Sequence, residues 1–186
     1  MNGRLTERII VAGFGGQGVM LAGKIIVHAG LSAGLNVTYI PSYGAEVRGG
    51  TAHCHVIISE GEIASPIIVQ PDACLVMNSP SLFKFTDRVL SGGWLIINSS
   101  LVDEPVDRED IADLRIPANL IAEDRGSLKA ANMAMLGAYV KNSKLLSLPD
   151  VQKSIGEFLP PRHRDLLKIN LEVLQDGHDY FSGAEK

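Results

Sequence analysis

The residues best suited to bind a ligand form a glycine cluster at positions 13–18, with the sequence GFGGQG. Gly13, Gly15 and Gly18 match the pattern G-x-G-x-x-G, in which glycines let the backbone turn with positive φ and approach a ligand closely. An apolar run precedes the cluster and a long apolar segment follows it, so the pattern predicts a strand, a tight turn and a helix. The first turn of such a helix offers N–H groups to a phosphate or carboxylate. The alternative is a turn that packs the strand against the helix and binds nothing.

A second stretch of specific-looking residues follows at positions 41–50, with the sequence PSYGAEVRGG. It comes directly after a segment expected to be a strand, and ligands and partner chains meet open α/β sheets at the carboxyl ends of the strands. We interpret its side chains, Tyr43, Glu46 and Arg48 among them, as contacts to a ligand or a neighbouring chain. A solvated turn between two strands explains the same residues without either contact.

Two histidines alternate along the next apolar run, His53 and His55, with Cys54 between them. Because successive side chains of a strand point to opposite faces, both imidazoles lie on one face and the thiol on the other. Two imidazoles at this spacing can begin a metal site, but no third ligand with suitable spacing follows nearby. We therefore expect packed or partly exposed histidines and no metal site.

Two nucleotide-binding motifs fit this sequence poorly. The dinucleotide fingerprint expects an acidic residue about 20 positions on, at the end of the second strand, whereas residues 39–42 read YIPS. Residues 18–24 match the spacing of a phosphate-binding loop, but Ile25 takes the place of the magnesium-binding Ser or Thr and the segment belongs to the expected helix. A nucleophile elbow, a Ser/His/Asp set and Cys-x-x-Cys are also missing, so we assign no catalytic residue. A standalone dinucleotide-dependent oxidoreductase and a structural adaptor remain alternatives.

The composition is that of an ordinary globular domain. The chain has 186 residues, of which 46% are hydrophobic and 20% charged, with a net charge of −4, so we expect one domain over residues 1–186. Mild acidity and 5% aromatic residues argue against a nucleic-acid surface. Two cysteines are too few for a disulfide framework or a four-thiolate cluster, which favours a reducing, cytoplasmic setting. Residues 1–8 do not resemble a signal peptide, and polar residues interrupt the apolar segment 25–45, which excludes a membrane span there.

The remaining pattern alternates strands with helices. We expect strands at 7–13, 36–40, 51–59, 72–77, 94–98 and 114–117, and helices at 17–33, 79–90, 127–141, 148–158 and 162–176. Right-handed crossovers make the second strand parallel to the first, and Pro41 should end it. Residues 63–69 suit an edge strand that pairs back. The predicted fold is an α/β, three-layer, mostly parallel Rossmann-like sheet with helices on both faces and room for one antiparallel edge strand.

Taken together, the two loops resemble the gamma subunit of 2-oxoacid:ferredoxin oxidoreductases, the pyruvate, ketoisovalerate and 2-oxoglutarate oxidoreductase gamma family. The resemblance covers nearly the whole chain, through Asp72, Asn78, the helix that contains Asn132, and a C-terminal pattern that ends at Tyr180. The glycine motif alone is weak evidence, whereas the two motifs at this separation are specific. Our candidate cofactor-binding residues are Gly13, Gly15, Gly16, Gln17, Gly18, Tyr43, Glu46 and Arg48.

The resemblance implies a multi-subunit enzyme that converts a 2-oxoacid and coenzyme A to an acyl-CoA and carbon dioxide and passes two electrons to ferredoxin. Thiamine diphosphate and iron–sulfur clusters then belong to the alpha, beta and delta partner subunits, coenzyme A is a substrate, and this chain alone binds no cofactor and is inactive. We favour 2-oxoglutarate, with pyruvate and branched-chain 2-oxoacids open and indolepyruvate-type enzymes as the nearest rival. We further expect indirect contact with ferredoxin, no nucleic acid or membrane partner, and a homodimer as one state of the isolated chain.

Overall fold

The computed structural model describes residues 5–42, 52–158 and 164–183 of the chain. Its strands are β1 (Thr6–Gly13), β2 (Asn36–Ser42), β3 (Ala52–Ser59), β4 (Ala73–Val76), β5 (Trp94–Asn98) and β6 (Ala112–Ile116). Its α-helices are α1 (Val19–Ser32), α2 (Ser79–Phe85), α3 (Ala118–Asp124), α4 (Ala131–Asn142), α5 (Leu148–Phe158) and α6 (Arg164–Asp179). Short 3-10 turns, Thr86–Arg88, Leu128–Ala130 and Tyr180–Gly183, flank three of these helices.

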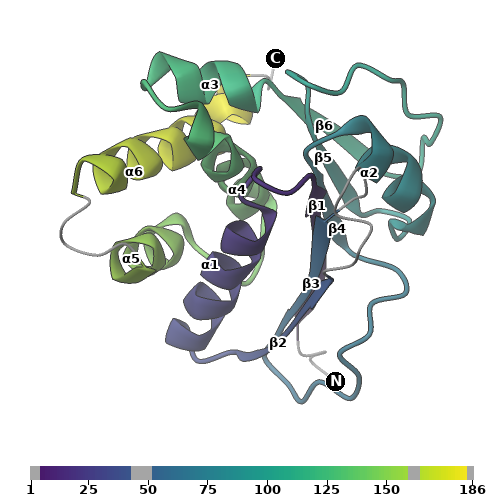
Figure 1. Cartoon of the computed structure of the whole chain (residues 1–186). Coiled ribbons are helices and arrows are strands. Elements are labelled where there is room, and N and C mark those ends of the chain that lie inside the picture. Colours follow the sequence, from purple (N-terminus) through teal and green to yellow (C-terminus); the bar gives the residue numbers. More distant parts are fainter. Residues whose placement is uncertain (1–4, 43–51, 159–163, 184–186) are drawn as a thin grey trace.

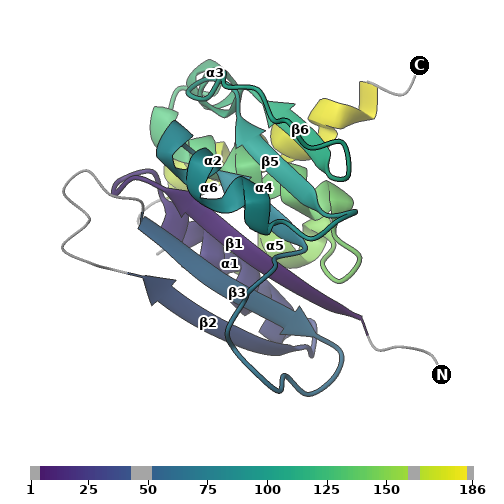
Figure 2. The ribbon, with the colours of Figure 1, turned by 90° about the vertical axis from the view of Figure 1, so that its right-hand side faces the viewer.

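The strands form one sheet in the order β2-β3-β1-β4-β5-β6. β1, β4, β5 and β6 run parallel, whereas β3 pairs antiparallel with both β1 and β2 (Figure 2). β2 therefore points in the same direction as β1, as expected, although β3 lies between them. The register aligns Gly13 with Ala52 and Ser42 with His53. The carboxyl ends of β1 and β2 thus lie at the same edge of the sheet.

The mostly parallel α/β sheet is confirmed, but the antiparallel strand is not at the expected place. Residues 63–69 form no strand, and the antiparallel member is β3, which occupies the second position from the edge. Pro41 does not end β2, because an edge strand tolerates a residue that cannot donate a ladder hydrogen bond. Helix α3 was not expected at all, and the helix expected to begin at residue 127 starts as a 3-10 turn.

The fold has three layers, with the sheet in the middle and helices on both of its faces. Figure 1 shows α1, α4, α5 and α6 over one face and α2 over the other. The side chains of β1 alternate accordingly, since Ile9 and Val11 belong to the core beneath α1 and α4 while Ile10 and Ala12 pack with Phe85 of α2. No helix in the described parts of the chain has the length and apolar character needed to cross a membrane. Burial of both faces of β1 explains its unbroken apolar sequence.

Helix α1 packs very closely on the sheet but is less buried than its composition predicts. A Cβ on Gly23 would lie 2.4 Å from the Cys54 thiol of β3, so only glycine permits this contact. On the outer side, however, Leu21 and Leu31 are 38% and 56% exposed. The buried residues of α1 therefore lie on the side that faces the sheet and the neighbouring helices, and part of its outer side is exposed. The sheet covers one side of α1, and α5 and α4 contact it from others.

A buried carboxylate joins β1 to the end of α4. Glu7 is 6% exposed and accepts hydrogen bonds from the Tyr139 hydroxyl at 2.6 Å, the Ser143 hydroxyl at 2.9 Å and the Lys144 backbone N–H at 2.6 Å. Burial, and then the nearby Glu7 charge, raises the pKa of Tyr139 well above its usual range, so its hydroxyl remains a donor. A buried carboxylate is costly unless donors surround it, and here three do.

We expect Tyr139→Phe to lower the free energy of unfolding by about 1–3 kcal/mol, because it removes one donor from a buried carboxylate. Chemical denaturation followed by circular dichroism measures the change. Tyr180→Phe is the matched control, since Tyr180 is 46% exposed and should lose almost nothing. Equal stability of the two variants would mean that the Glu7 contact contributes nothing to the fold.

Candidate functional site

The glycine turn between β1 and α1 needs its glycines for two different reasons. Gly16 and Gly18 have φ values of 93° and 75°, in the left-handed region that other residues rarely adopt. At Gly13 the limit is space, since a Cβ there would lie 2.6 Å from Oε1 of Gln17 and 2.8 Å from Cβ of Met77. Gly15 is exposed. The predicted strand, turn and helix are therefore confirmed, whereas ligand binding by these residues stays a prediction.

Gln17 fixes the shape of the turn. Its Oε1 accepts a hydrogen bond from the Phe14 N–H at 2.6 Å, and its Nε2 donates to the Met77 carbonyl at 3.0 Å. Both ends of the amide are thus used inside the protein, one within the turn and one at the residue that follows β4. Gln17 consequently holds the glycine turn against the neighbouring strand, and any contact it makes with a ligand is additional to that role.

Asn132 supports the turn from the opposite side. This residue of α4 is 4% exposed, and its Nδ2 donates to the Gly18 carbonyl at 3.2 Å. A Cβ on Gly18 would lie 2.4 Å from that nitrogen, so the close approach also requires glycine. The first turn of α1 has no side-chain cap and no acidic residue. Its positive end is therefore not neutralised by the helix itself, which suits an anion.

A groove of about 450 Å³ opens beside the turn at the carboxyl edge of the sheet. Its lining comprises Gly16, Gln17, Met77, Leu101, Asn119, Leu128, Lys129 and Ala131. Lys129 supplies a positive charge, and the described residues that line the groove include no acid. Leu101 and Leu128 are 47% and 50% exposed. The groove therefore combines a cationic side chain and the glycine turn that precedes α1 with apolar walls.

Asn119 and Lys129 are groove residues that the sequence analysis missed. Asn119 Oδ1 accepts from Nδ2 of the fully buried Asn98 at 3.0 Å, and the Asn119 N–H donates to the Ser100 hydroxyl at 3.2 Å. A signal was present, because Asn98 ends β5 and Asn119 follows β6, at the carboxyl ends of two parallel strands. No such pattern pointed to Lys129, because this residue does not follow a strand and lies in the 3-10 turn before α4.

The second half of the predicted site lies outside the described residues. This applies to Tyr43, Glu46 and Arg48, so their roles stay predictions. The flanking residues Ser42 and Ala52 do lie in the sheet, at the same edge as Gly13. The two predicted motifs are thus attached to one edge of the sheet, as the order of the elements required.

The paired histidines lie on the α2 face of the sheet, away from the groove. The His53 ring is 5.5 Å from the His55 ring and 5.1 Å from the Phe85 ring, and no set of three metal-ligating side chains occurs among the described residues. Burial, then the charges of His53, Arg88 and Lys84, lowers the pKa of His55 to about 4. Cys54 and Cys74 are buried core residues, and burial raises the pKa of each thiol to about 12.

We expect Gln17→Leu to lower the free energy of unfolding by about 1–2 kcal/mol, because the Phe14 N–H and the Met77 carbonyl both lose a partner. Thermal and chemical unfolding measure this loss. Gln70→Leu serves as the control because Gln70 is exposed. If Gln17→Leu unfolded like the control, the side-chain amide would not hold the turn.

The His55 shift sets a direction for the dependence of stability on pH. The folded pKa of about 4 lies below the usual 6.5, so the unfolded chain takes up the proton first and stability falls as the pH drops from about 6.5 to about 4. His55→Gln should reduce this part of the fall. Unfolding midpoints of both proteins between pH 7 and pH 4 test it, together with an NMR titration of the imidazole. A difference between the proteins that does not change with pH would contradict the shift.

Comparisons with known proteins agree with this architecture. Residues 8–180 match the family described as pyruvate ferredoxin/flavodoxin oxidoreductase. The chain is 33% identical to the 2-oxoglutarate synthase subunit KorC of Methanothermobacter marburgensis, over 98% of this chain and 100% of that one. It is 34% identical to the ketoisovalerate oxidoreductase subunit VorA of the same organism, over 93% of this chain but only 36% of VorA. The chain thus spans about a third of the length of that relative.

Solved structures show the same fold. The gamma subunit of a keto/oxoacid ferredoxin oxidoreductase from Geobacter sulfurreducens superimposes with a TM-score of 0.83 at 27% identity, over 95% of this chain and 99% of that one. A 2-oxoglutarate:ferredoxin oxidoreductase from Magnetococcus marinus superimposes with a TM-score of 0.86 at 24% identity, over 97% of this chain and 32% of that one. The expected α/β fold is therefore shared both with a separate subunit and with part of a longer chain.

Proposed function

The chain belongs to the pyruvate ferredoxin/flavodoxin oxidoreductase family, and from this premise we propose that it is the gamma subunit of a multi-subunit 2-oxoacid:ferredoxin oxidoreductase. The complex converts a 2-oxoacid and coenzyme A to an acyl-CoA and carbon dioxide, and passes two electrons to ferredoxin. Relatives that it matches end to end support a separate subunit with a single gamma-type domain over residues 1–186. We place the complex in the cytoplasm.

The observation that carries this proposal is the groove beside the glycine turn. A phosphate group of coenzyme A would find Lys129 and the turn that leads into the positive end of α1 there, without an acid among the described lining residues to oppose it. Gln17 and Asn132 hold the turn in place for that contact. Coenzyme A is thus a substrate whose anionic part this chain positions, while the reacting carbon lies elsewhere.

Partner chains would complete the site. Thiamine diphosphate supplies the carbon chemistry and iron–sulfur clusters take the electrons, and we assign both to the alpha, beta and delta subunits. Three large apolar side chains near the groove support contact with another polypeptide, since Phe14, Leu101 and Leu128 are all at least 39% exposed. The stretch with Tyr43, Glu46 and Arg48, attached at the same edge of the sheet, is our candidate for charged contacts across this interface.

We favour 2-oxoglutarate as the 2-oxoacid. The support is the match with KorC, which extends over that entire chain, whereas VorA is matched over about a third of its length. Contacts to the 2-oxoacid itself belong to the partner subunits in this proposal, so the groove does not decide between acids. Substrate preference of the assembled complex, tested with 2-oxoglutarate, pyruvate and branched-chain 2-oxoacids, would settle the choice.

Co-purification tests the proposal most directly. The tagged full-length chain should recover subunits that carry thiamine diphosphate and iron–sulfur clusters, and the recovered complex should reduce ferredoxin only when both a 2-oxoacid and coenzyme A are present. A chain that purifies alone and oxidises NADH would instead establish the standalone dinucleotide-dependent oxidoreductase. If the complex assembled and its turnover did not depend on the groove residues, the structural adaptor would be the remaining alternative.

We expect Lys129→Met to raise the KM for coenzyme A by about tenfold, because a charged hydrogen bond to a phosphate is worth about 1.5–3 kcal/mol. kcat and subunit assembly should remain unchanged. Lys153→Met is the control, since Lys153 is exposed on α5, away from the groove. An unchanged KM in an intact complex would show that Lys129 does not contact coenzyme A. The assignment of the chain as a gamma subunit would not be affected.

A further inference from the structure

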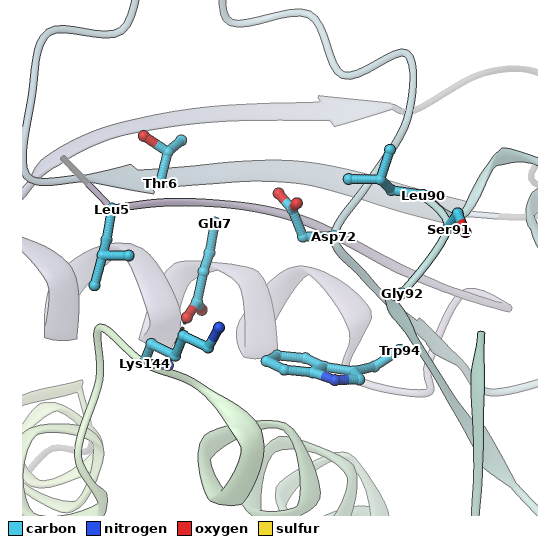
Figure 3. Close-up of a pocket in the computed structure, with 10 residues that line it drawn as sticks. Leu5, Thr6, Glu7, Asp72, Leu90, Ser91, Gly92, Trp94 and Lys144 are labelled. Atoms are coloured by element: carbon cyan, nitrogen blue, oxygen red, sulfur yellow. Dashed lines mark hydrogen bonds between the residues drawn. The ribbon is translucent and has the colours of Figure 1, made fainter. Parts of the chain in front are cut away.

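A second hollow lies at the opposite edge of the sheet, at the amino ends of the parallel strands (Figure 3). Its volume is about 170 Å³. Its lining includes the side chains of Leu5, Glu7, Asp72, Leu90, Trp94 and Lys144, together with Thr6 and the segment 91–93. They come from the start of β1, the residue before β4, the turn before β5, the start of β5 and the residues after α4. We call this hollow the amino-edge pocket.

Glu7 is part of the wall of the amino-edge pocket and is not open for a ligand. Its two oxygens already accept three hydrogen bonds, from Tyr139, Ser143 and the Lys144 backbone. This carboxylate therefore fixes the position of the chain around Lys144. A ligand can therefore bind only to polar atoms of the pocket that have no hydrogen-bond partner within the described part of the protein.

Two such groups of opposite charge face the pocket. Asp72 Oδ2 accepts from the Arg8 N–H at 2.8 Å and from Arg8 Nη1 at 3.2 Å, whereas Asp72 Oδ1 has no donor among the described residues. The Lys144 ammonium likewise has no ion-pair or hydrogen-bond partner among them. In Figure 3 these two side chains approach the pocket from different sides and do not pair with each other. The pocket thus presents one negative and one positive group held apart.

Apolar side chains form another part of the lining. The indole of Trp94 is half-buried and lies along the side of the pocket where Lys144 enters, as Figure 3 shows. Leu5 and Leu90 border the opening and are 42% and 38% exposed. A volume of about 170 Å³ is small for a nucleotide or a coenzyme but suits a compact metabolite. Trp94 is also the only tryptophan of the chain, so its fluorescence reports on this pocket.

We propose that the amino-edge pocket binds a free α-amino acid with an apolar side chain. The carboxylate of the amino acid pairs with Lys144, its ammonium group pairs with Asp72 Oδ1, and its side chain packs on the Trp94 indole. Asp72 already pairs with Arg8 through Oδ2, so a simple anion leaves only its Oδ1 without a donor, and a simple amine leaves Lys144 without a partner. The zwitterion is the ligand that engages Asp72 Oδ1, Lys144 and the Trp94 indole together. This site is independent of the coenzyme groove and of the function proposed for it.

Intrinsic fluorescence of the purified full-length chain tests the ligand class. L-Leucine should change the Trp94 emission in a saturable way. Its two matched analogues, 4-methyl-2-oxopentanoate without the ammonium group and 3-methylbutylamine without the carboxylate, should each bind at least about tenfold more weakly because one charged contact is lost. A chain whose emission does not respond to leucine, or that binds all three compounds equally, would overturn the proposal.

Variants test the location. Asp72→Asn and Lys144→Met should each weaken leucine binding by about tenfold or more. Lys144 is exposed, so its variant should keep the fold, which its unfolding midpoint verifies. Lys141→Met is the matched control, because Lys141 is an exposed lysine near the end of α4 that does not line the pocket. A leucine response that is unchanged in both pocket variants would place the binding elsewhere and refute the assignment.

Discussion

Helix α4 is the constraint on which the rest of the structure depends. Its residues from Ala131 to Val140 are all buried, between the sheet on one side and α6 on the other. Gly137 of α4 and Gly177 of α6 bring the two backbones together, because a Cβ on Gly177 would lie 2.2 Å from the Ala134 carbonyl. Polar contacts hold both ends of α4, since Asn132 bonds to Gly18 of the glycine turn and Tyr139 bonds to Glu7 of β1. One buried helix therefore sets the geometry of both edges of the sheet.

The local parts of the fold could be predicted because their causes are local. The glycine turn follows from glycine spacing, and the bounds expected for α5 agree with the structure because proline and an amphipathic pattern define them. The position of β3 could not be predicted in the same way. An apolar run such as residues 52–59 indicates burial but not direction, and its insertion between β1 and β2 depends on contacts distant in sequence. The short helix α3 gave no periodic pattern long enough to recognise.

The candidate groove was only partly predictable for a related reason. Residues of the glycine turn are adjacent in sequence, so their spacing was informative. Asn119 and Lys129 reach the same place from beyond β6 and before α4, and only the folded chain brings them to the turn. Gln17 shows the opposite limit. Its place in the motif suggested a ligand contact, which stays a prediction. The spacing gave no sign that both ends of its amide also hold the turn, where the buried carbonyl of Met77 requires a donor.

The two edges of the sheet are physically connected but should act independently. Lys129 precedes α4 and Lys144 follows it, so both hollows border the ends of one helix. Coupling between them would require α4 to move, since energetic coupling needs an element with two arrangements that both sites bias. Close backbone contact at Gly137 and hydrogen bonds at both ends hold α4 tightly in its place, and tightly packed interiors resist small displacements. Because the helix that positions both edges is held this tightly, we expect a contact at the carboxyl edge to leave the amino edge unchanged.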